Sequence, residues 1–422
     1  MKQYHSFIFD SYAFDRSSGK VELHYALDDE VRFTETLTLP EPIEYAGDED
    51  ALDRALFLLH LFGGISYFKT CCPKTIEVRS GTLTKEQAAF WNTVYTKGLG
   101  QFFFENKVDF RGLINFPATS EESSAIAATE KNGTAGTLVP VGGGKDSVVT
   151  VEKLKKEGRT MTLFRMGSHP IIDQIAKTAD LPLLTVRRQL SQKLFALNEE
   201  GALNGHVPIT GYLSALTIVI SELYGFDAVA MSNEKSASEG NTEYMGEEIN
   251  HQWSKGKEFE TMFREYLKRF VTKSIRYENP LRDMTELEIA KEFTGYPRYF
   301  PLITSCNKNW KILKEKEGRG AATKPNAGGA GGAWCGDCPK CAFVFALFAA
   351  HLPKDTVEKM FRKNLFADAG LLPLYRELLG IEGCKPFECI GTAEETQEAF
   401  RLAHEQGAYE DTPAMQLYLS TK

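Results

Sequence analysis

The stretch VPVGGGKDSVVT, residues 139–150, constrains the fold of this chain more than any other feature. An apolar run leads into three consecutive glycines, and a helix-forming pattern begins directly after them. Glycines that follow a strand let backbone amides approach an anion closely, and the N-terminus of the next helix adds its positive dipole end. The junction therefore predicts a phosphate-binding loop between a strand and a helix of an α/β protein.

Two common phosphate loops do not fit this stretch. The Walker loop requires Ser or Thr after its Gly-Lys pair, where this chain has Asp146, and an earlier glycine where it has Val139. The dinucleotide fingerprint requires a third glycine at the position of Ser147. Neither pattern identifies the phosphate that the loop binds.

Asp146 indicates that the loop binds phosphates together with a magnesium ion. An acid beside phosphates is favourable mainly where it faces a magnesium ion that bridges them. The neighbouring Lys145 can neutralise phosphate charge, so both side chains are expected to act in catalysis. The predicted phosphate-binding site consists of Gly142, Gly143, Gly144, Lys145, Asp146 and Ser147.

Strand and helix patterns alternate around this loop. The predicted strands are 137–141, 160–164 and 183–186, and the predicted helices are 147–157 and 169–179. Such alternation indicates βαβ units and a parallel sheet. A further helix at 212–224 leads to a strand that ends near Glu234. Ligands of these folds lie beyond the carboxyl ends of the strands, where the glycine loop and Glu234 both fall.

The flanking regions follow other patterns. Residues 7–39 alternate as in a β-meander, and helices are expected around 51–62 and after Thr84, where Thr84 and Gln87 can form a capping box. Residues 118–136 are small and polar, as at a domain boundary, and residues 317–333 form a glycine-rich stretch expected to be a flexible loop. The predicted organisation is an N-terminal α+β domain at 1–130, an ATP-binding domain at 131–305 and a C-terminal helical region with a cysteine cluster at 306–422.

Four of the eight cysteines have the spacing of a metal site. Cys335, Cys338 and Cys341 form C-x-x-C-x-x-C, and Cys306 can complete a tetrahedral set. We expect a structural zinc ion, with an iron-sulfur cluster as the alternative. The other four cysteines are expected to be core or surface thiols: Cys71, Cys72, Cys384 and Cys389.

Composition excludes several classes of partner. The 422 residues carry 57 acids and 49 bases, for a net charge of −8, with no long basic run that would follow a phosphate backbone. Nucleic acid is therefore not expected. The N-terminus lacks the apolar core of a secretory signal, and the most apolar stretches fall short of the roughly 18 uncharged residues of a membrane span. We expect a cytoplasmic protein that does not enter a membrane.

The glycine loop resembles that of the PP-loop ATP pyrophosphatases, whose signature is Ser-Gly-Gly-x-Asp-Ser. Gly143, Gly144, Asp146 and Ser147 match this signature, and Gly142 replaces its first serine. The resemblance implies a Rossmann-like core that cleaves ATP between the α and β phosphates, adenylates a substrate and releases pyrophosphate. The cysteine arrangement is similar to that of the 7-cyano-7-deazaguanine synthases of this superfamily, whose cysteines hold zinc, although the interval before Cys335 is much longer here.

Several stretches together resemble a narrower family, the UDP-N-acetylmuramoyl-L-alanyl-L-glutamate epimerases. These stretches are LHYALDDEVRFTETLTLP, VPVGGGKDS, SNEKSASEGN, NHQWSKGKEFE and WCGDCPKCAFVF. The resemblance implies an ATP- and magnesium-dependent inversion of the terminal L-glutamate of a UDP-muramoyl dipeptide. Adenylation would remove the carboxylate charge and make the α-proton acidic enough for a side-chain base.

The proton-transfer groups must come from outside the glycine loop. Glu234, Glu239, His251 and Lys255 all follow the same predicted strand and are candidates, of which we name Glu234 and His251 as catalytic. Arg187 and Arg188 follow another strand and are expected to meet diphosphate or carboxylate groups of the substrate. The alternative function is that of another adenylating PP-loop enzyme, of the deazaguanine synthase or tRNA-thiolating type.

Overall fold

A mixed nine-stranded sheet forms the centre of the part of the chain that the computed structural model describes, residues 2–43, 47–120, 136–306, 308 and 334–422. The strand order is β11-β8-β5-β6-β7-β3-β2-β1-β4. Most of the expected boundary segment, residues 121–135, and the glycine-rich stretch 317–333 lie outside the described residues.

One half of the sheet is parallel. Its strands are β5 (Thr137–Pro140), β6 (Met161–Met166), β7 (Leu183–Gln189), β8 (Ala228–Ala230) and β11 (Arg276–Glu278). The α-helices between β5 and β8 are α4 (Lys145–Lys156), α5 (Pro170–Ala179), α6 (Gln192–Glu199) and α7 (Ile209–Tyr224). The predicted βαβ alternation is confirmed, and the predicted α/β class with it.

The N-terminal strands continue this sheet. The expected meander is β1 (Ser6–Asp15), β2 (Lys20–Leu27) and β3 (Val31–Thr38), and β4 (Thr75–Val78) pairs in parallel with β1. Strand β3 pairs antiparallel with β7, with Leu37 opposite Arg188. The meander therefore shares one sheet with the glycine-loop region. The division of the chain at residues 130 and 305 stays a prediction.

Helices and short strands cover the N-terminal half. They are α1 (Glu49–Phe68), α2 (Lys85–Gly98), α3 (Gly100–Asn106), α8 (Lys257–Tyr266) and the hairpin of β9 (Thr242–Tyr244) and β10 (Glu247–Ile249). The predicted capping box is present at α2, where Thr84 accepts from the amide of Gln87 and the Gln87 side chain accepts from the amide of Thr84. A π-helical turn at Leu267–Val271 extends α8.

Adjacent residues of the parallel strands face two separate cores, as the period of two in a strand requires. Leu138 packs into a core with α1, α7 and α8, whereas Val139 packs into a second core with α4, α5 and the C-terminal helices. Strand β8 divides in the same way, with Val229 in the first core and Ala230 in the second. The parallel sheet is thus buried on both faces.

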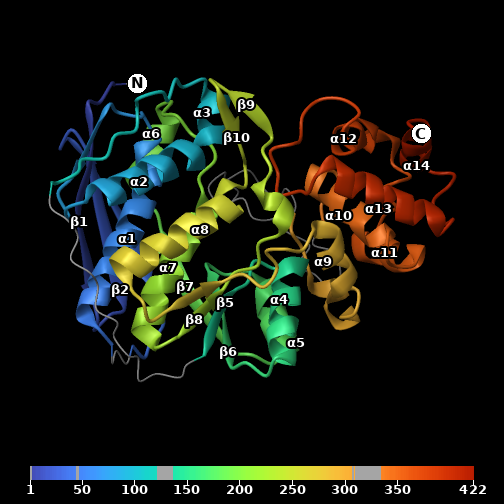
Figure 1. The fold of residues 1–422 in the computed structure, drawn as a ribbon, viewed down its shortest axis with the longest axis horizontal. Coiled ribbons are helices and arrows are strands. Elements are labelled where there is room, and N and C mark those ends of the chain that lie inside the picture. The colour runs from blue at the N-terminus through green and yellow to red at the C-terminus, as the bar shows by residue number, and fades with distance from the viewer. Residues whose placement is uncertain (1, 44–46, 121–135, 307, 309–333) are drawn as a thin grey trace.

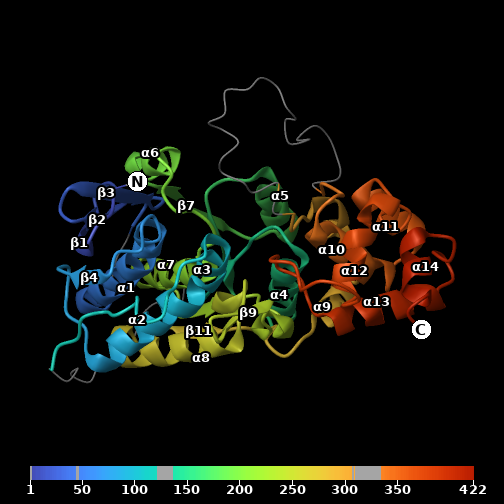
Figure 2. The same ribbon diagram turned by 90° about the horizontal axis from the view of Figure 1, so that it is seen from above.

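The C-terminal region is helical, as predicted. It contains α10 (Pro339–Ala349), α11 (Lys354–Phe361), α12 (Leu372–Leu378), α13 (Ala393–Glu405) and α14 (Pro413–Leu419). Helix α9 (Glu286–Phe293) contacts α4, α10 and α13, and so joins this group to the glycine-loop region (Figures 1 and 2). Among the described residues, none of the helices combines the length and the apolar character that crossing a membrane requires.

Candidate active site

The glycine loop connects β5 to α4 at the carboxyl edge of the parallel strands. Gly143 has a φ of +86°, a left-handed conformation that favours glycine, and its carbonyl accepts a 2.8 Å hydrogen bond from the amide of Thr304. A Cβ added at Gly142 would meet no atom within 4 Å. Helix α4 has Gly144 as its N-cap, and no side chain of the described residues caps it. Its first-turn amides are therefore available to an anion.

Lys145 points into the protein rather than along the loop. Its ammonium lies 2.5 Å from the Asp146 carboxylate and also bonds to Glu286, which is fully buried. Burial by itself lowers the pKa of Lys145, but the two carboxylates outweigh it and raise that pKa above its ordinary value. The Asp146 side chain remains 21% exposed, so a cation can reach it from the loop side.

Glu286 lies between two lysines. Lys340 of α10 contacts its second carboxylate oxygen at 3.3 Å, and the Lys340 ammonium also donates to the Cys389 carbonyl. Burial opposes the charge of Glu286, but Lys145 and Lys340 together hold the pKa of this carboxyl at about 2. This ion cluster ties the glycine loop to the C-terminal region.

Glu234 follows β8, which is the neighbour of β5 in the sheet. The segment around it is fixed because Asn279 accepts from the Asn233 amide at 3.1 Å and Arg282 donates to the Glu234 carbonyl at 2.9 Å. Glu234 is 2% exposed, whereas Glu239 is exposed. Because β5 and β8 are parallel neighbours, Glu234 and the glycine loop lie at the same edge of the sheet.

His251 lies between residues from distant parts of the chain. Its Nδ1 is 2.5 Å from Gln101 Oε1, its Nε2 is 3.7 Å from the Cys389 thiol, and its ring centroid is 4.6 Å from that of His206. Burial, assisted by the charge of Lys255, lowers the pKa of His251 to about 4. The imidazole is therefore neutral at pH 7 and can accept a hydrogen bond.

Lys255 has the opposite character. Burial opposes its charge, but Cys389, Glu234 and Asp146 outweigh the burial and raise the pKa of Lys255 above its ordinary value. Of the four sequence candidates for a base, Lys255 is thus held as an ammonium. Lys255 also connects the glycine loop to the surroundings of His251, since it interacts with Asp146 of the loop and with Cys389 beside His251.

Sequence reasoning missed three residues of this region, Glu286, Lys340 and Cys389. Glu286 and Lys340 stand in ordinary helical patterns, and only their contacts reveal them. Cys389 was expected to be a core or surface thiol, and its loop is held against the middle of the chain by bonds from Asn241 to the Pro386 carbonyl and from Gln252 to the Ile390 carbonyl.

The two arginines have different surroundings. Arg187 is exposed. The guanidinium of Arg188 lies 2.8 Å from Glu35 and 3.8 Å from the centroid of the Tyr212 ring, at the junction of β3 and β7. These contacts give Arg188 a structural role at this junction. Its contact with substrate stays a prediction.

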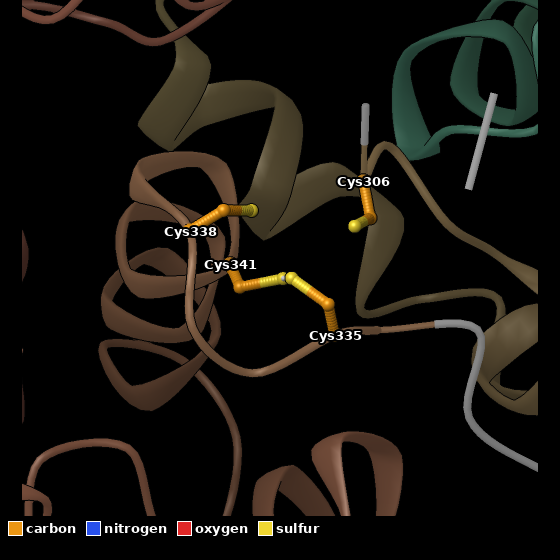
Figure 3. Close-up of side chains that lie close together, drawn as sticks. All are labelled: Cys306, Cys335, Cys338 and Cys341. Carbon is orange, nitrogen blue, oxygen red and sulfur yellow. Dashed lines mark hydrogen bonds between the residues drawn. The ribbon is translucent and has the colours of Figure 1, made fainter. Parts of the chain in front are cut away.

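The four cysteines of the predicted metal site converge (Figure 3). The sulfurs of Cys306, Cys335, Cys338 and Cys341 all lie within 4.8 Å of one another, and this cluster could bind a metal ion. Cys306 lies two residues after Thr304, whose amide contacts Gly143.

Comparisons with known proteins cover almost the whole chain. Residues 1–278 match the MurL N-terminal domain, and residues 302–421 match the MurL C-terminal domain. Proteins named UDP-N-acetyl-alpha-D-muramoyl-L-alanyl-L-glutamate epimerase are similar to it. The one from Salinispora tropica is 38% identical over 98% of this chain and 88% of its own length, and the one from Xanthomonas oryzae pv. oryzae is 36% identical over 99% and 90%. The resemblance inferred from the sequence motifs is confirmed, and this chain belongs to the MurL family.

Proposed function

We propose that this protein is an ATP-dependent epimerase that inverts the terminal L-glutamate of UDP-N-acetylmuramoyl-L-alanyl-L-glutamate to D-glutamate during peptidoglycan precursor synthesis. The names of its relatives support the reaction. The observation that carries the mechanism is the open N-terminus of α4 with Asp146 beside it, at the sheet edge that Glu234 also occupies. This arrangement joins an anion site to groups that can transfer protons.

The glycine loop would bind the phosphates of ATP. Residues 142–144 and the first turn of α4 offer amides that can donate to phosphate oxygens. Asp146 would hold magnesium, whose charge would stabilise the leaving pyrophosphate. Lys145 is held by Glu286, so its part is to orient the Asp146 carboxylate toward that cation.

Adenylation of the substrate carboxylate prepares the α-carbon for inversion. Deprotonation beside a free carboxylate would place a second negative charge next to the first, whereas an acyl adenylate behaves like an ester. The neutral His251 and the carboxylate of Glu234 are then groups suited to move the α-proton. The glutamate nitrogen is tied up in an amide, so a Schiff base with pyridoxal phosphate cannot form.

We further propose that the four-cysteine cluster binds a structural zinc ion. Four cysteine sulfurs within 4.8 Å of one another offer the ligand set that is typical of structural zinc. The ion would fix Cys306, and through the neighbouring Thr304 it would support the conformation of Gly143. Metal analysis of the purified protein distinguishes zinc from an iron-sulfur cluster.

The test of this function is a turnover assay with ATP, magnesium and the UDP-muramoyl dipeptide that ends in L-glutamate. The expected result is D-glutamate in the hydrolysed product, together with AMP and pyrophosphate. AMP formation only on a different acceptor, such as a deazaguanine precursor or tRNA, would favour the alternative enzyme class. D-glutamate formed without ATP would contradict the proposed mechanism.

A further inference from the structure

Cys389 lies beside His251 and Lys255, and the proposed function does not yet use its thiol. Its sulfur is 3.7 Å from Nε2 of His251, and it hydrogen-bonds with the ammonium of Lys255. The thiol is partly exposed, so a ligand can reach it. A thiol between an imidazole and an ammonium has a hydrogen-bond acceptor for its S–H group and a counter-charge for its thiolate.

The backbone around Cys389 is held in place from several sides. Lys340 donates to the Cys389 carbonyl, and Gln252 donates to the carbonyl of the next residue, Ile390, at 3.1 Å. Asn241 holds the Lys385 and Pro386 carbonyls at 3.2 and 2.8 Å. The sulfur thus has a fixed position relative to His251, as a catalytic group requires.

Cys389 is coupled to the glycine loop in two ways. Lys340 contacts both the Cys389 carbonyl and Glu286, and Glu286 bonds to Lys145 at the start of α4. Lys255 interacts with Cys389, Glu234 and Asp146. The ammonium of Lys255 therefore connects both the Cys389 thiol and Glu234 to the glycine loop, where the substrate carboxylate would be held.

We propose that Cys389 is a catalytic proton-transfer residue of the epimerisation, with Lys255 stabilising its thiolate, His251 accepting a hydrogen bond from the thiol form, and the thiol proton leaving to solvent. This inference rests on the proposed function. The thiolate takes the α-proton of the glutamyl adenylate, so that a C–H bond breaks, an S–H bond forms and the C–H electron pair becomes the enolate. The carboxyl group of Glu234 then returns a proton to the other face of the α-carbon, so that its O–H bond breaks and a new C–H bond forms. The step needs no oxidant or reductant.

The experiment uses Cys389→Ala and Cys389→Ser in the full-length protein, with Cys384→Ser as the matched control. Cys384 is an exposed thiol of the same loop. Three quantities are measured in D₂O with each epimer of the substrate: ATP–pyrophosphate exchange, deuterium at the α-carbon, and conversion to the other epimer. The serine variant preserves the side-chain volume, which keeps the test valid if the alanine variant is unstable.

Both Cys389 variants are expected to keep ATP–pyrophosphate exchange within about twofold of the wild type. Epimerisation should fall by about 10²- to 10⁴-fold, the usual contribution of one proton-transfer group. They should also exchange the α-proton of one epimer only, because the base on the other face is intact. A merely structural role would not produce this asymmetry.

Two results would overturn the inference. One is a Cys389→Ser variant that epimerises within fivefold of the wild type and of Cys384→Ser. The other is a variant that loses ATP–pyrophosphate exchange and epimerisation together, which would make Cys389 a structural residue. Failure of the proposed function looks different, since the wild type itself would then form no D-glutamate.

Discussion

Replacing Glu286 by glutamine should destabilise the protein strongly, because this carboxylate compensates two buried ammonium groups. Glu286 is 0% exposed and contacts Lys145 and Lys340, whose side chains are 3% and 4% exposed. The pKa of Glu286 falls from 4.5 to about 2 in the folded protein. The depression means that the carboxylate form stabilises the folded protein at neutral pH. Removing one partner of a buried ion pair costs about 3–5 kcal/mol.

The contribution of Glu286 has a defined pH dependence. Its folded pKa is depressed, so its stabilisation is fully present above the unfolded pKa of 4.5 and is lost as pH falls toward about 2. The difference between the wild type and Glu286→Gln should therefore fall from about 3–5 kcal/mol at pH 7.5 to a smaller value at about pH 3. Urea unfolding followed by circular dichroism at both pH values measures it.

Glu292→Gln is the matched control for this prediction. Glu292 lies on the same helix, and its 3.2 Å ion pair with Lys156 is at the surface, where such pairs contribute at most about 1 kcal/mol. If the unfolding free energy of Glu286→Gln were within about 0.5 kcal/mol of the wild-type value at pH 7.5, the buried ion cluster would not hold the glycine loop as described.

Three further predictions concern the loop and the metal site. Asp146→Ala should abolish pyrophosphate release without changing the circular dichroism spectrum, since its side chain is partly exposed; full activity would contradict the magnesium role. Gly142→Ser should keep ATP turnover because the added atoms meet open space, whereas Gly143→Ala, at a φ of +86°, should cost about 1 kcal/mol of unfolding free energy and weaken ATP binding in calorimetry. Cys306→Ser, or removal of metal by a chelator, should lower the bound zinc measured by mass spectrometry and raise the KM for ATP, because Thr304 contacts Gly143; an unchanged KM in metal-free protein would refute this coupling.

The local elements of this fold could be predicted from the sequence because they depend on short-range periodicity. The strands and helices around the glycine loop, and the capping box of Thr84 and Gln87, all involve residues a few positions apart. The pairing of β3 with β7 could not be predicted in this way. It joins segments about 150 residues apart in sequence, and the choice of partner strand depends on how the two cores pack.

The residues of the candidate site also divide into those that a local motif could identify and those that only the folded structure reveals. The glycine loop and the cysteines Cys335, Cys338 and Cys341 have short motifs with fixed spacing, so their residues could be named in advance. The partners of Lys145 and His251 could not, since Glu286 is 141 positions from Lys145 and Cys389 is 138 positions from His251. The ion pair of Arg188 with Glu35, 153 positions away, likewise could not be predicted from a local pattern.

The account depends most on transfer of AMP to the substrate carboxylate, and oxygen labelling tests this step directly. The dipeptide substrate is prepared with ¹⁸O in the α-carboxylate of its terminal glutamate and converted with ATP and magnesium in unlabelled water. Mass spectrometry of the released AMP should show one ¹⁸O atom, because water attacks the acyl carbon of the adenylate. D-glutamate formed together with AMP that contains no ¹⁸O would contradict the account.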